Sequence, residues 1–181
     1  MILEKGQKIV FAGDSVTDDG RKRPIGEGLW EGVGKGFVRM IDTFLTVDYP
    51  ELFIHCVNMG ESGNTSRDLL ARWDKDILER NPDWVVLCIG FNDVWRQYDS
   101  PTQQDHWVMP EEYRNNLNAM ADKTTAKMIW MTPYYLEPNE NDPMRKRMDE
   151  YGTICKEEAA KRGIPCVDLQ ASFTEILKNR Y

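Results

Sequence analysis

Long apolar stretches and a surplus of basic residues are both missing from this sequence of 181 residues. The longest apolar runs, such as residues 84–89, fall far short of the ~20 residues that a membrane-spanning helix needs. The N-terminal residues pass directly into a polar turn, so we expect no signal peptide. The formal net charge of -7 argues against a nucleic-acid partner, because phosphates require a basic binding face.

Paired cysteines are missing as well. The four cysteines are scattered, with no Cys-x-x-Cys pair and no spacing typical of metal ligands: Cys56, Cys88, Cys155 and Cys166. Three of them lie in apolar runs, where a reduced cysteine behaves as a small buried hydrophobe. We therefore predict a cytoplasmic protein without structural disulfides.

Domain boundaries are not visible either, since the chain has no internal repeat, low-complexity tract or break in composition. With 41% hydrophobic and 29% charged residues, the composition is that of an ordinary globular protein. The length fits one unit with a substantial core. We predict a single domain over residues 1–181.

Strand-like apolar runs alternate with helical patterns along the chain. The five runs cover residues 8–12, 53–57, 84–89, 128–132 and 165–169. Between them, apolar residues recur at helical spacing, for example in residues 37–45 and 113–121. Thr65 and Asp68 have the spacing of a capping box. This alternation predicts an α/β fold with a parallel sheet covered by helices on both faces.

Polar turn residues follow the first three of these runs, where the chemistry of such sheets is usually found. Asp14 and Ser15 follow the first run, Gly60 the second, and Asn92 and Asp93 the third. A serine on a tight strand-to-helix turn presents its hydroxyl to a carbonyl carbon. The N–H groups of Ser15 and Gly60, with the side-chain amide of Asn92, are placed to stabilise the resulting oxyanion. The residue pattern therefore points to acyl transfer.

The same three blocks resemble those of the SGNH hydrolases, also called GDSL-type esterases and lipases. The resemblance implies a flavodoxin-like three-layer sandwich with a five-stranded sheet. It also implies a serine esterase or acylhydrolase that cleaves small acyl or acetyl esters. Ser15 would be the nucleophile, Gly60 and Asn92 the oxyanion donors, and Asp14 and Asp93 supporting residues. Such hydrolysis requires a small-molecule ester substrate and neither a metal nor an organic cofactor.

One block of this family has no match in the sequence, namely the Asp-x-x-His that supplies the general base. The only histidines, His55 and His106, have Leu52 and Gln103 at the position of the aspartate. Because the sequence stops within a helical pattern, we expect that a C-terminal segment is missing and that catalysis is impaired. A serine without its base is a poor nucleophile near neutral pH. Apolar surface exposed by such a loss would favour a homo-oligomer.

Three alternatives stay open at this stage. In the first alternative, the chain is a catalytically inactive flavodoxin-like module that only binds a ligand. In the second, His106 in the loop after Asn92 replaces the missing base. The third alternative is a phosphatase with Asp14 as nucleophile, although such enzymes generally have a second aspartate two positions later, where this sequence has Val16. The basic stretch at residues 21–23 is interpreted as a solvated loop. The aromatic residues after the third and fourth runs, Tyr134 among them, are candidates for a pocket wall.

Overall fold

The fold is a parallel sheet of five strands, seen here in a computed structural model that describes residues 2–180. The strands are β1 (Lys8–Gly13), β2 (His55–Asn58), β3 (Trp84–Cys88), β4 (Lys127–Met131) and β5 (Cys166–Val167). All neighbouring pairs are parallel, and the order across the sheet is β2-β1-β3-β4-β5. This is the flavodoxin-like order, so the predicted fold class is confirmed.

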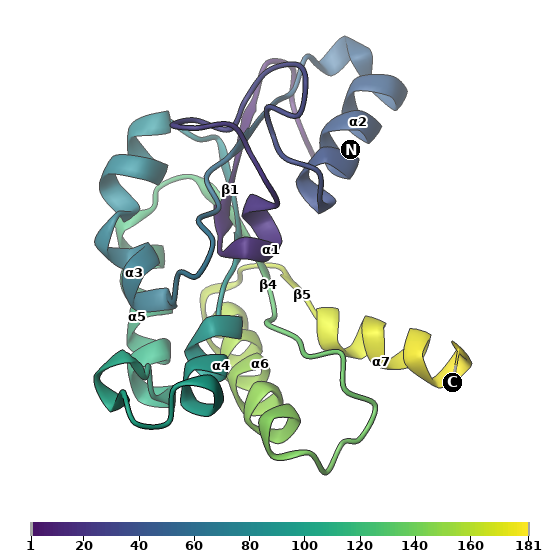
Figure 1. Cartoon of the computed structure of the whole chain (residues 1–181). Coiled ribbons are helices and arrows are strands. Elements are labelled where there is room, and N and C mark those ends of the chain that lie inside the picture. The colour runs from purple at the N-terminus through teal and green to yellow at the C-terminus, as the bar shows by residue number, and fades with distance from the viewer. Residues whose placement is uncertain (1, 181) are drawn as a thin grey trace.

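Helices cover both faces of this sheet. They are α1 (Ser15–Asp18), α2 (Phe37–Asp48), α3 (Ser66–Ala71), α4 (Phe91–Asp99), α5 (Pro110–Lys123), α6 (Pro143–Arg162) and α7 (Leu169–Arg180). Short turns of other helix types are η1 (Pro50–Leu52), η2 (Trp73–Ile77), η3 (Leu78–Arg80) and η4 (Gln104–His106). Figure 1 shows α2 on one side of the sheet and α3, α5 and α6 on the other.

The strand side chains alternate between two cores, as burial on both faces requires. Val10, Val85 and Leu87 belong to the core that includes residues of α3, α5 and α6. Phe11 and Val86 point to the opposite core, under α2. Apolar side chains on both faces explain why the strands are continuous apolar runs in the sequence.

Local signals in the sequence place several helix ends correctly. Thr65 and Asp68 form the predicted capping box, with Thr65 N–H donating to Asp68 Oδ2 at 2.9 Å. Pro110 stands at the first turn of α5, and Gly163 ends α6 in a left-handed conformation with φ +66°. None of the helices within residues 2–180 has both the length and the apolar character needed to cross a bilayer.

The two edge strands differ from their predicted apolar runs by two residues at one end. Phe53 takes a left-handed φ of +49° at the end of η1, so β2 begins only at His55. At the other edge of the sheet, Leu169 N–H donates to Thr132 Oγ1 at 3.0 Å and the chain enters α7. β5 is therefore limited to two residues.

Leu117 on α5 tests the core beneath α5 and α6, because its side chain is only 1% exposed. We expect Leu117→Ala to lower the free energy of unfolding by about 2–5 kcal/mol, through lost burial and the cavity left behind. Met40→Ala, at a position that is 72% exposed, is the control and should change it by less than about 0.5 kcal/mol. Urea unfolding measures both, and equal midpoints for the two variants would contradict this core assignment.

Candidate active site

Ser15 is the exposed residue of the turn between β1 and α1. It is the first residue of α1, and its hydroxyl has no hydrogen-bond partner within residues 2–180. The turn requires Gly13, because a Cβ there would clash with Thr17 and with the Cys88 carbonyl. Ser15 opens into a mainly apolar pocket of about 440 Å³, with walls that include Val16, Phe37, Met131, Tyr134 and Phe173.

Asp14, directly before the serine, is buried and caps α1. Its side chain is 2% exposed, and Oδ1 accepts a hydrogen bond from Val16 N–H at 3.0 Å. Burial raises the pKa of Asp14 to about 6, and the Val16 N–H offsets part of that effect. A buried carboxylate committed to a helix cap is not presented to a substrate. The alternative of a phosphatase with Asp14 as nucleophile therefore loses its reacting group.

Gly60, predicted as an oxyanion donor, is engaged on both sides of its backbone. Its N–H donates to Asn58 Oδ1 at 2.9 Å, and its carbonyl accepts from Arg21 Nε at 2.6 Å. A Cβ at this position would clash with the backbone nitrogen of Asp18. Gly60 thus allows the loop after β2 to pack on α1. Contrary to the prediction, its N–H is not a free donor in this structure.

Gly63, three residues later, has the donor that Gly60 lacks. It adopts a φ of +85°, and its N–H has no acceptor in the described part of the chain. The next residue, Asn64, accepts a hydrogen bond from Asn92 Nδ2 at 2.9 Å through its carbonyl. Because a carboxamide has two N–H groups, Asn92 retains one for a ligand. The contact between Asn92 and Asn64 places the predicted donor Asn92 beside the Gly63 loop.

Asp93 links α4 to the start of α3. It is fully buried and accepts hydrogen bonds from the backbone N–H of Ser66, at 2.9 Å to Oδ2, and from the Ser66 hydroxyl. Asn116 donates to that hydroxyl at 3.0 Å. Burial raises the pKa of Asp93 to about 7, against the lowering effect of the Ser66 bonds. These hydrogen bonds tie the first turn of α4, which also carries Asn92, to the start of α3.

Arg72, which the sequence did not single out, joins the ends of two strands to the Gly63 loop. Its Nη2 donates to the Gly13 carbonyl at 3.2 Å and its Nη1 to the Met59 carbonyl at 2.9 Å. Its Nε donates to Asn64 Oδ1 at 2.7 Å, and Asp76 balances its charge at 3.2 Å. The side chain is only 16% exposed. Arg72 therefore holds the backbone before Ser15 and before Gly60 in fixed relation.

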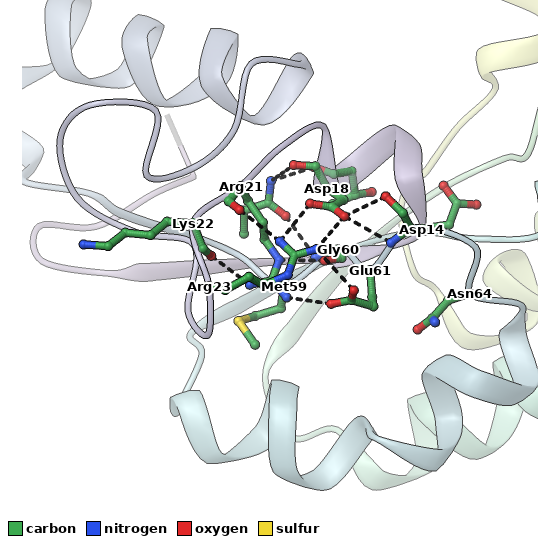
Figure 2. A network of polar contacts seen from close by, with 12 residues as sticks. Asp14, Asp18, Arg21, Lys22, Arg23, Met59, Gly60, Glu61 and Asn64 are labelled. Carbon is green, nitrogen blue, oxygen red and sulfur yellow. Dashed lines mark hydrogen bonds and ion pairs between the residues drawn. The ribbon is translucent and has the colours of Figure 1, made fainter.

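A second arginine network orders the loop between α1 and α2 (Figure 2). The Asp18 carboxylate accepts hydrogen bonds from both Nη atoms of Arg23, at 3.0 and 2.7 Å. It also accepts hydrogen bonds from the backbone N–H and the hydroxyl of Ser62. Although burial alone would raise it, the pKa of Asp18 is held at about 2 by Arg23 and Ser62. Arg21 is 5% exposed and reaches Glu61 at 3.2 Å. The interpretation of residues 21–23 as a solvated loop is therefore wrong for Arg21.

Neither histidine borders the pocket of Ser15. His55 is the first residue of β2, so it lies at the amino ends of the strands, whereas the site lies at their carboxyl ends. Its Nε2 is 3.2 Å from a Glu27 carboxylate oxygen. His106 lies in η4 and borders a separate polar cleft together with Gly63 and Arg96. Of the aromatic candidates, Tyr134 does border the pocket, where it stacks on Phe173 with ring centroids 4.5 Å apart.

Comparison with known proteins agrees with the resemblance to GDSL-type esterases. The family model of the GDSL-like Lipase/Acylhydrolase family matches residues 11–180. An acetylxylan esterase of Geobacillus stearothermophilus is 47% identical over 184 residues, covering 100% of this chain and 84% of the relative. Its crystal structure superposes with a TM-score of 0.97, with the same coverage of both chains. An α/β hydrolase from the metagenome of Lake Arreo, Spain, is 44% identical, with a TM-score of 0.95 over 99% of this chain and 84% of the other.

Further structures of the Geobacillus enzyme describe changes of single residues. Three are called catalytic mutants, in which a serine, an aspartate or a histidine is replaced by alanine. In a further structure, of a tryptophan mutant, the enzyme is called an acetyl-xylooligosaccharide esterase.

Arg72→Met tests the arrangement of the strand ends. Three oxygens, on Gly13, Met59 and Asn64, would lose a charged donor in a largely buried site. We expect the free energy of unfolding to fall by about 2–4 kcal/mol, because the Met59 carbonyl and Asn64 Oδ1 lose their donor and bear a desolvation cost, while the Gly13 carbonyl keeps the Glu61 N–H at 3.0 Å. Urea unfolding measures the effect. Arg39→Met on α2 is the control for loss of charge, and equal stability of the two variants would contradict the role given to Arg72.

Asp14→Asn tests the burial of the carboxylate, since asparagine keeps the cap but has no charge to bury. The pKa of Asp14 is raised from 3.8 to about 6 in the folded chain, so the folded state holds the proton of this carboxyl more tightly than the unfolded state does. The stability that results is fully present below pH 4 and is lost as the pH rises through 6. The stability of Asp14→Asn relative to wild type should therefore rise by up to about 3 kcal/mol between pH 4 and pH 8. Urea unfolding at both pH values measures this difference. A difference between Asp14→Asn and wild type that does not change with pH would refute it.

Proposed function

The chain belongs to the GDSL-like lipase/acylhydrolase family and is a carboxylic ester hydrolase, and we propose that it removes acetyl groups from acetylated xylan or its oligosaccharides. Ser15 is the nucleophile of this proposal. The observation that carries it is the exposed Ser15 hydroxyl at the carboxyl end of a buried strand. Arg72 and Asn64 tie this strand end to the segments that hold the N–H groups of Gly63 and Asn92. The acetyl group and the xylan backbone are taken from the 47%-identical relatives.

The three N–H donors of this proposal come from three different segments. They are the Ser15 N–H, the Gly63 N–H and the second side-chain N–H of Asn92, none of which has an acceptor within residues 2–180. Gly63 replaces Gly60 in this role because the Gly60 N–H is bonded to Asn58. Loss of one donor of this kind typically costs roughly a hundred- to a thousandfold in rate.

The reaction then follows from the chemistry of the ester. Ser15 Oγ forms a bond to the acetyl carbonyl carbon, and the carbonyl electron pair moves to the oxygen, where the three N–H groups stabilise it. Collapse of this intermediate breaks the bond to the sugar oxygen, which leaves as the alcohol after taking up a proton. Water attacks the acetyl-serine in the same way, releasing acetate and restoring the Ser15 hydroxyl.

Transfer of the Ser15 proton requires a base, and neither His55 nor His106 borders the Ser15 pocket. We propose that these 181 residues by themselves turn over slowly, because an oxyanion site without a base gives only residual catalysis, of order 10³–10⁴ over water in serine proteases. The same observation favours a second candidate, a module that binds the acetylated sugar without cleaving it. Labelling of Ser15 separates the two.

Intact mass after exposure to a fluorophosphonate probe is the first test of the proposal. We expect one adduct, formed slowly, that disappears in Ser15→Ala and persists in the control Ser172→Ala, since Ser172 lies on α7 outside the pocket. Added imidazole should raise the rate of labelling, because it supplies the base from solution. The imidazole effect in Ser15→Ala gives the background.

Two outcomes would contradict the esterase proposal. An adduct that survives in Ser15→Ala would place the reactive group elsewhere. No adduct at any imidazole concentration, with an acetylated xylooligosaccharide still raising the Tm by mass action, would support the binding module instead.

A further inference from the structure

We infer that the polar cleft beside Gly63 is a subsite for a neutral sugar ring of the substrate, with Arg96 as its principal contact. This inference rests on the proposed function and deepens it, since it assigns the alcohol portion of the ester to a particular surface. The cleft has a volume of about 360 Å³ and lies between the start of α3, the end of α4 and η4. Its walls include Gly63, Arg67, Asp68, Arg96, Gln103 and His106.

The chemical character of this cleft is the opposite of that of the Ser15 pocket. Leu, Val, Phe, Met and Trp side chains do not contribute to its walls, which are built from charged, amide, hydroxyl and imidazole groups. The Ser15 pocket, in contrast, has Val16, Phe37 and Met131 in its walls. A polyhydroxylated alcohol therefore finds hydrogen-bond partners in the polar cleft and few in the apolar pocket.

Arg96 connects the cleft to the oxyanion donors. It follows Asn92 by four residues on α4, so the two side chains lie on the same face, separated by about 6 Å of helix rise. A Cβ at Gly63 would lie 3.8 Å from Arg96 Nη2, which places the guanidinium against the open face of that glycine. A sugar attached to an acetyl group held by Gly63 and Asn92 is within reach of Arg96.

The charges around the cleft are balanced, and this favours a neutral ligand over an anion. The Arg67 guanidinium is bound by both carboxylate oxygens of Glu112, at 2.6 and 2.8 Å. Arg96 Nη1 donates to Asp99 at 2.6 Å. The Asp68 carboxylate in the cleft adds a further negative charge. Phosphate or carboxylate ligands would therefore meet no net positive field.

Arg96 nevertheless keeps donors for a ligand. Only its Nη1 has a hydrogen-bond partner in the described residues, which leaves Nε and Nη2 unused on one edge of the guanidinium. The side chain of Gln103 and the ring of His106 are also without hydrogen bonds within residues 2–180, apart from a 3.6 Å approach of His106 to Asp105. Two parallel N–H groups on a planar edge match a pair of neighbouring sugar hydroxyls.

Titration of the Ser15→Ala chain with xylotetraose, which has no acetyl group, tests the subsite by calorimetry. We expect Arg96→Gln in this background to weaken binding about tenfold or more, as loss of charged hydrogen bonds does. Gln103→Ala, in an exposed loop where folding is not at risk, should weaken it several-fold. Arg39→Gln on α2 changes the charge equally, away from the cleft, and should bind as the background does. Circular dichroism melting confirms that each variant folds.

Several results would overturn the inference. They are undetectable binding of xylotetraose to the Ser15→Ala chain, unchanged affinity in both Arg96→Gln and Gln103→Ala, and tighter binding of inorganic phosphate than of xylotetraose. The fluorophosphonate test is independent of all three. Labelling of Ser15 without saccharide binding would therefore end the subsite alone, and saccharide binding without labelling would end the esterase proposal alone.

Discussion

Backbone carbonyls at the ends of β1 and β2 need hydrogen-bond donors that the sheet itself does not provide, and two largely buried arginines supply them. Arg72 binds the Gly13 and Met59 carbonyls, and Arg21 binds the carbonyl of Gly60. Because a guanidinium is planar and has five donors in fixed directions, it sets the relative position of the groups it binds. The turn that presents Ser15 and the loop that contains Gly63 are consequently held as one unit. This arrangement is the basis of the whole candidate site.

Buried carboxylates add a second constraint, and their surroundings give them different charge states. Asp18 faces Arg23 and Ser62 and keeps its negative charge at any ordinary pH, whereas burial pushes the pKa of Asp14 to about 6 and that of Asp93 to about 7. Helix caps and N–H groups stabilise all three. Ser15 itself lies exposed beside them. The structure thus places its polar framework under the turn and leaves the hydroxyl accessible from the apolar pocket.

The fold was predictable because its signals are local or periodic. Apolar runs bounded by turns predicted all five strands, and the capping box of Thr65 and Asp68 predicted the start of α3. The errors fall where tertiary contacts override a local pattern. β5 stops after Val167 because Leu169 bonds to the Thr132 hydroxyl, and Phe53 leaves its predicted strand for a left-handed turn.

The sequence by itself determined the fold class, the family resemblance, and the positions of Ser15 and Asn92 at neighbouring strand ends. The fold class and the two positions follow from periodicity and from the rule that parallel strands end at one edge of a sheet, whereas the family resemblance rests on the residues of the three motifs. Which glycine keeps a free N–H was decided only by the tertiary structure. Gly60 and Gly63 stand three residues apart in one turn-forming stretch, and the choice depends on Asn58 and on what the loop packs against. The roles of Arg72 and Arg21 are likewise invisible in sequence, since an arginine near a loop is normally solvated, and only long-range folding brings the strand-end carbonyls to it.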